Sequence, residues 1–100
     1  MTSLQKHTIE ISKLCDAHKV KRLYAVGSIL TDKFNEHSDV DFIVEFNSVD
    51  INQYADNYYD LKFSLQDILK RKVDLLEQKA IKNPFFLEVL KNQRQLVYGH

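Results

Sequence analysis

One stretch of the chain alternates between large apolar residues and other residues, and this alternation limits the possible folds most strongly. Residues 39–46 read DVDFIVEF, in which Val40, Phe42, Val44 and Phe46 occupy every second position. A period of two places these four side chains on one face of a β-strand. We therefore expect a sheet with one face against a core, which requires further strands and a covering layer.

Apolar patterns elsewhere predict those other elements. Steps of three and four over residues 54–68 indicate a long helix with one stripe on the sheet. A capping box of Thr2 and Gln5 would open an earlier helix with Leu4, Ile11, Leu14 and Cys15 as its apolar seam. Further predictions are strands at 23–26 and 73–76, a last helix with Asn83 as its N-cap and Pro84 as its first residue, and an edge segment or tail at 95–98.

This order of elements predicts an α/β fold with a small mixed sheet covered by helices. One hundred residues suffice for a single domain, which we place at 1–100. Two glycines and one proline indicate short connections between regular elements.

Charge and composition narrow the classes of function. A formal net charge of zero gives no bulk attraction to nucleic acid or to an acidic membrane, and the cluster at 70–72 is typical of a solvated helix end. No apolar run reaches the ~20 residues that span a bilayer, and the polar N-terminus lacks the apolar core of a signal peptide. The single Cys15, which we expect to be buried, fits a reducing compartment, so the sequence predicts a cytoplasmic protein.

Two aspartates stand on the strand face opposite the apolar one. The Cα atoms of Asp39 and Asp41 would lie about 6.6 Å apart on a strand, and two carboxylates at that spacing repel by roughly 2.5 kcal/mol at an effective dielectric of about 20. A divalent cation such as magnesium or manganese would make this pair favourable. The alternative is that Asp39 is a turn or cap residue and Asp41 is merely exposed.

The preceding strand ends at Gly27 and Ser28, where a helix could begin. Glycine permits close backbone approach, serine supplies a hydroxyl, and the free amides of a helix N-terminus bind phosphate. A cation site and an anion site on adjacent strand ends would together suit a metal-bound nucleoside triphosphate.

These residues also carry a family resemblance. Gly27 and Ser28 are followed, after ten residues, by Asp39 and Asp41, which is the G-S-x10-D-x-D signature of the DNA-polymerase-beta-like nucleotidyltransferase superfamily. The segments RLYAVGS, SDVDFIVEF, KVDLLE, NPFF and QLVY are similar to the minimal nucleotidyltransferase (MNT) family. The resemblance covers residues 21–98 and implies a palm-like nucleotidyltransferase fold.

The resemblance implies a third catalytic carboxylate, Asp74, which interrupts an apolar strand in KVDLLE. Asp39 and Asp41 would be shared metal ligands, with Asp74 as general base or second-metal ligand, at one or two Mg²⁺ sites where Mn²⁺ can substitute. The alternative for Asp74 is a salt bridge with Lys72 or Arg71.

The chain departs from the family pattern after the Gly-Ser pair. Relatives commonly continue x-A-R-G, with the arginine near the phosphates, whereas this chain continues Ile29-Leu30-Thr31-Asp32. Thr31 and Asp32 thus replace the arginine and the glycine. Lys33 would supply the missing positive charge and bind nucleotide, although Asp32 opposes it.

The resemblance further implies the reaction and the partner. MNT proteins are antitoxin partners of HEPN-domain ribonucleases and transfer AMP from ATP to a toxin tyrosine. The 100 residues leave little chain for an acceptor pocket, so we expect a protein acceptor or an oligomer, with itself or with a partner, that completes the site. The alternatives are a small-molecule nucleotidyltransferase of the antibiotic-modifying type and a binding module that neutralises its partner by occlusion.

Overall fold

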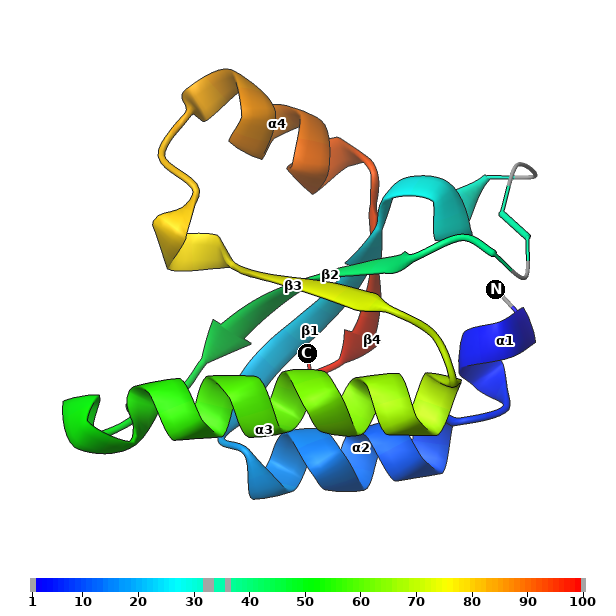
Figure 1. The fold of residues 1–100 in the computed structure, drawn as a ribbon. Helices are drawn as coiled ribbons and strands as arrows, with labels where there is room; N and C mark the ends of the chain where they lie inside the picture. Colours follow the sequence, from blue (N-terminus) through cyan, green and yellow to red (C-terminus); the bar gives the residue numbers. More distant parts are fainter. Residues whose placement is uncertain (1, 32–33, 36, 100) are drawn as a thin grey trace.

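The computed structural model describes residues 2–31, 34–35 and 37–99. Its elements, in chain order, are α1 (Thr2–Gln5), α2 (Thr8–Ala17), β1 (Val20–Val26), the 3-10 turn η1 (Gly27–Leu30), β2 (Val40–Phe46), α3 (Ile51–Leu69), β3 (Val73–Glu77), the 3-10 turn η2 (Gln78–Ala80), α4 (Pro84–Asn92) and β4 (Arg94–Tyr98). Figure 1 shows a sheet with α2 and α3 side by side along one face and α4 on the other side. Among the described residues, no helix combines the length and apolarity needed to cross a membrane.

The four strands form one mixed sheet in the order β3-β2-β1-β4. β1 pairs antiparallel with both β2 and β4, whereas β2 and β3 run parallel. The parallel pair requires a crossover, and α3 supplies it along the lower face of the sheet. The predicted small mixed sheet with helical cover is confirmed.

The alternating residues of β2 divide the molecule into two faces. Val40, Phe42 and Val44 are almost completely buried in the core beneath α2 and α3, which supply Ile11, Cys15, Leu61 and Leu65. The expected burial of Cys15 is confirmed, and burial raises the pKa of its thiol to about 12. The opposite face of β2 carries Asp41, Ile43 and Glu45. The alternation that places apolar residues in the core therefore also places the acidic residues on the face away from it.

The covering of that second face is thinner. Among the described residues, Ile81 and Leu90 alone are partly buried hydrophobic residues packed against the small cluster formed by Tyr24, Val26 and Ile43. Asn83 caps α4 as predicted, because its side-chain oxygen accepts hydrogen bonds from the backbone N–H groups of Phe85 and Phe86. Nevertheless α4 contributes no buried residue to the fold.

Two helix predictions need correction. The first predicted helix is divided into α1 and α2, since the Thr8 hydroxyl donates to the carbonyl oxygens of Leu4 and Gln5 and competes with the helical pattern. The helix expected at Ser28 is a single 3-10 turn, because the backbone N–H and the hydroxyl of Thr31 both bond back to the Ser28 carbonyl.

Candidate nucleotide-binding and catalytic site

Two of the predicted aspartates lie directly opposite one another across the parallel strands. Asp41 of β2 is in register with Asp74 of β3, on the face that the core does not use. Burial, followed by hydrogen bonding with Asp74 and the negative charges of Asp74 and Asp39, raises the pKa of Asp41. A carboxyl group whose ionisation is disfavoured by burial and by neighbouring carboxylates is a common feature of catalytic and metal-binding sites.

Asp39 lies outside this facing pair. β2 begins at Val40, so Asp39 precedes the paired strand; its side chain is 47% exposed, with Lys72 Nζ 4.0 Å from Asp39 Oδ2. The alternative pairing of Asp74 with Lys72 or Arg71 is therefore wrong: Arg71 donates to the carbonyl oxygens of Asn35 and Ser38. Within the described part of the chain, no lysine or arginine forms an ion pair with Asp74.

The donor set is chemically suited to a hard divalent cation, since it consists of carboxylate oxygens that repel each other when ionised. Across residues 2–31, 34–35 and 37–99, however, no three histidine, cysteine or acidic side chains are close enough together to hold an ion. Asp39 would have to leave Lys72 and join Asp41 and Asp74 to complete a three-aspartate site.

Gly27 brings the backbone at the end of β1 against the Asp41 carboxylate. Its φ is +78°, and a Cβ at this position would lie 2.7 Å from Asp41 Oδ2. Ser28 follows, half-buried, and no described residue hydrogen-bonds to its hydroxyl. Glycine is thus needed here for close approach, and the serine hydroxyl beside it remains available to a ligand. Lys33 and Asp32, which the sequence analysis also considered, lie outside the described residues.

Sequence reasoning missed the far side of this site. A hollow of about 450 Å³ is lined by Gly27, Leu30 and Thr31 on one side and by Gln93 on the other. Gln93 lies at the junction of α4 and β4, more than 60 positions later in the chain. The only available signal was the segment after α4, whose pairing with β1 the sequence left open as either an edge segment or a tail.

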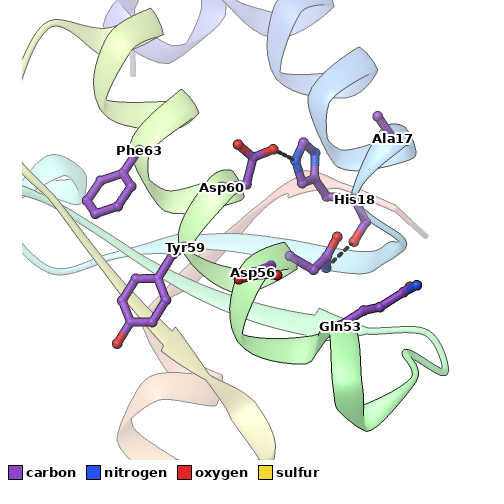
Figure 2. Close-up of a pocket in the computed structure, with 8 residues that line it drawn as sticks. Ala17, His18, Gln53, Asp56, Tyr59, Asp60 and Phe63 are labelled. Atoms are coloured by element: carbon purple, nitrogen blue, oxygen red, sulfur yellow. Dashed lines mark hydrogen bonds and ion pairs between the residues drawn. The ribbon is translucent and has the colours of Figure 1, made fainter.

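A second hollow, of about 640 Å³, lies between the end of α2 and α3 (Figure 2), and its lining includes none of Asp39, Asp41 and Asp74. Two of its polar contacts join the two helices: His18 Nε2 lies 2.5 Å from Asp60 Oδ2, and Asn57 donates to the His18 carbonyl at 2.8 Å. Tyr59 and Phe63 are exposed at its margin. We attribute to these contacts a role in joining α2 to α3.

Comparison with known proteins identifies the class. A sequence profile of the nucleotidyltransferase domain matches residues 10–97, which include every aspartate described above. The chain belongs to the nucleotidyltransferase domain family, and the predicted enzyme class is confirmed.

Particular relatives are more informative. Two proteins of Methanocaldococcus jannaschii, each 34% identical over 85% of this chain and 82% of their own, have names that propose protein adenylyltransferase activity. A solved structure described as a proposed minimal nucleotidyltransferase superposes with a TM-score of 0.78 at 22% identity, over 94% of this chain and 92% of that one. A complex of a tri-AMPylated Shewanella oneidensis HEPN toxin with its MNT antitoxin superposes with a TM-score of 0.65 at 21% identity, over 97% of this chain and 73% of that one. The chain is thus a nucleotidyltransferase that shares its fold with these minimal nucleotidyltransferases.

Proposed function

We propose that this nucleotidyltransferase moves AMP from ATP to a tyrosine hydroxyl of a HEPN-type toxin and thereby acts as its antitoxin. The observation that carries the proposal is the facing pair Asp41 and Asp74, with the backbone of Gly27 held against it. Among the structurally similar complexes, one contains a tri-AMPylated HEPN toxin, and another toxin–antitoxin complex was solved with AMP-PNP. These relatives support AMP transfer between the two proteins of such a pair.

In the proposed reaction, the acceptor oxygen attacks the α-phosphorus of ATP. A new oxygen–phosphorus bond forms, the bond between the α-phosphorus and the oxygen bridging to the β-phosphate breaks, and pyrophosphate leaves. The hydroxyl proton passes to a carboxylate, and Asp74 is the general base that we assign, because it faces Asp41 from the neighbouring strand. The amides of η1 and the Ser28 hydroxyl bind phosphate oxygens from the end of β1.

Magnesium, with manganese as a substitute, is the cofactor that fits these oxygen ligands. Asp39, Asp41 and Asp74 would hold it. When bound, such an ion supplies charge neutralisation on the phosphates and favours the ionised form of the acceptor hydroxyl. The carboxylates themselves align the acceptor with the α-phosphate and receive its proton.

The test is to incubate the purified chain with a HEPN-type partner, ATP and magnesium, and to weigh the partner intact. We expect a mass gain of one or more AMP units, located on a tyrosine by peptide mapping and abolished by EDTA. Asp41→Asn should lose the activity. The matched control is Glu45→Gln, since Glu45 lies on the same strand face but binds Arg22 at 3.0 Å, away from the site.

Neutralisation by occlusion is the competing function that the missing arginine at Thr31 favours. A tight complex whose partner gains no mass in the presence of ATP and magnesium would contradict AMP transfer and support occlusion. Transfer of AMP to an aminoglycoside but not to the partner would instead support the antibiotic-modifying alternative.

A further inference from the structure

The sheet register places an arginine in the same row as the aspartates. Arg94 of β4 lies opposite Val26 of β1, and Val26 lies opposite Asp41 of β2. Residues directly opposite one another share a face of the sheet, so Asp74, Asp41, Val26 and Arg94 form one row across all four strands. Two strand spacings of about 4.8 Å separate the backbones at Asp41 and Arg94 by roughly 10 Å.

The guanidinium of Arg94 is held by an aromatic ring rather than by an acid. Its Cζ lies 3.9 Å from the centroid of the Tyr24 ring, and Tyr24 is buried. Among the residues that the structure describes, no carboxylate forms an ion pair with Arg94. A cation–π contact orients the guanidinium while leaving its N–H groups available for oxygen acceptors.

Arg94 also lines a cavity that continues the one at Gly27. This cavity, of about 430 Å³, is bounded by Leu30 and Thr31 at the end of η1 and by Gln93 and Arg94 at the junction of α4 and β4. The hollow of about 450 Å³ beside Gly27 shares Leu30, Thr31 and Gln93 with it. The two therefore adjoin, and together they connect the Asp41 end of the site to the arginine.

We propose that Arg94 binds the two phosphates of ATP that leave as pyrophosphate, and so positions the nucleotide across the end of β1. The inference rests on the proposed AMP transfer. A triphosphate that approaches Asp39, Asp41 and Asp74 meets like charges, so a cation is needed at the other end. Thr31 carries no charge, and Arg94 supplies one from the opposite wall of the same hollow. The planar guanidinium matches phosphate oxygens in two-pronged contacts.

The experiment compares the affinities of wild type and variants for ATP and for AMP in the presence of magnesium. Arg94→Gln should weaken ATP by about 10- to 100-fold, the effect of losing a hydrogen-bonded charge. AMP, which lacks the two leaving phosphates, should bind Arg94→Gln as well as wild type. Arg94→Lys should give an intermediate loss of ATP affinity, because lysine keeps the positive charge but cannot form the two parallel hydrogen bonds of a guanidinium. The matched control is Arg22→Gln, which removes an arginine that pairs with Glu45 on the neighbouring strand and should leave both affinities unchanged.

A second measurement uses the unaltered protein, in case removing Arg94 from Tyr24 impairs folding. Phenylglyoxal modifies arginines, and peptide mapping distinguishes Arg22, Arg71 and Arg94. ATP should slow modification of Arg94 alone, and AMP should not slow it.

Several results would contradict the inference. Equal ATP affinity in Arg94→Gln, or equal losses for ATP and AMP, would overturn the assignment of Arg94 and leave AMP transfer standing. Modification of Arg94 at an unchanged rate under saturating ATP would do the same. A wild-type chain that binds no ATP with magnesium would overturn both proposals.

Discussion

Gly27 has a backbone φ of +78°, and a Cβ at this position would meet Asp41 Oδ2 at 2.7 Å. Gly27→Ala should therefore lower the free energy of unfolding by about 1–3 kcal/mol, through the left-handed backbone and the steric conflict together. Urea denaturation measures the loss. In an Asp41→Ala background the steric part disappears and only the backbone part should remain. If Gly27→Ala lowers the free energy of unfolding by the same amount in the Asp41→Ala protein as in wild type, the steric conflict with Asp41 contributes nothing.

Asp41 gives a prediction about pH. Its pKa is raised in the folded state, by burial first and then by Asp74 and Asp39, so the native protein holds this proton more tightly than the unfolded chain. Stability from this group is fully present below the unfolded value of about 3.9 and is lost as pH rises through the folded pKa. Asp41→Asn cannot ionise, so the variant does not lose this stability as the pH rises.

Urea denaturation of wild type and Asp41→Asn should therefore show the variant gaining relative stability between pH 4 and pH 7. Asp39→Asn is the comparison variant and should gain less, because Asp39 is the smallest of the causes that raise the pKa of Asp41 and is itself exposed, with Lys72 at 4.0 Å. A variant that is less stable than wild type at pH 7 would show that Asp41 is a structural residue.

At the residue scale, the sequence pattern predicted the strand face that each side chain occupies better than it predicted the contacts of that side chain. Asp41, Asp74 and Gly27 lie together because alternation on β2 and β3 fixes the face that each side chain occupies. Asp39 differs, since the strand starts one residue later than expected and leaves it beside Lys72. The sequence near Arg94 does not predict that this residue lies in the same row as Asp41, because that relation depends on the order of strands and not on sequence spacing.

At the scale of elements, α3 and α4 depend on their caps in different ways. Asn83 accepts two backbone hydrogen bonds at the start of α4, and Asp50 accepts one from Asn52 at the start of α3. Losing such a cap costs about 0.5–2 kcal/mol. Because α4 buries no residue, Asn83→Ala should release α4 locally without lowering global stability.

Hydrogen exchange separates these two outcomes. Amide exchange over residues 84–92 should accelerate in Asn83→Ala, whereas amides of β2 keep their protection. In the matched variant Asp50→Ala the cost should appear in global unfolding, because α3 places Leu61 and Leu65 in the core. Equal exchange rates in α4 with and without Asn83 would contradict the role of this cap.

At the scale of the whole molecule, periodicity predicted the strands and the long helix, but the arrangement of the sheet was not readable from the sequence. An alternating segment shows which face is buried and carries no information on which strand lies next to it. The segment after α4 is the clearest case: it pairs with β1 as an edge strand, its side chains are at best half-buried, and its apolar pattern is correspondingly weak.

The pairing of β4 with β1 also affects when the molecule is complete during synthesis. β1 leaves the ribosome early, together with the helices and strands that bury the core, whereas its second neighbour emerges only after α4. The wall that holds Gln93 and Arg94 is therefore the last part of the site to be synthesised, well after Gly27, Asp41 and Asp74. If that wall binds the triphosphate, chains interrupted before residue 94 should hold ATP more weakly than the full chain, and translation itself would time the onset of full affinity.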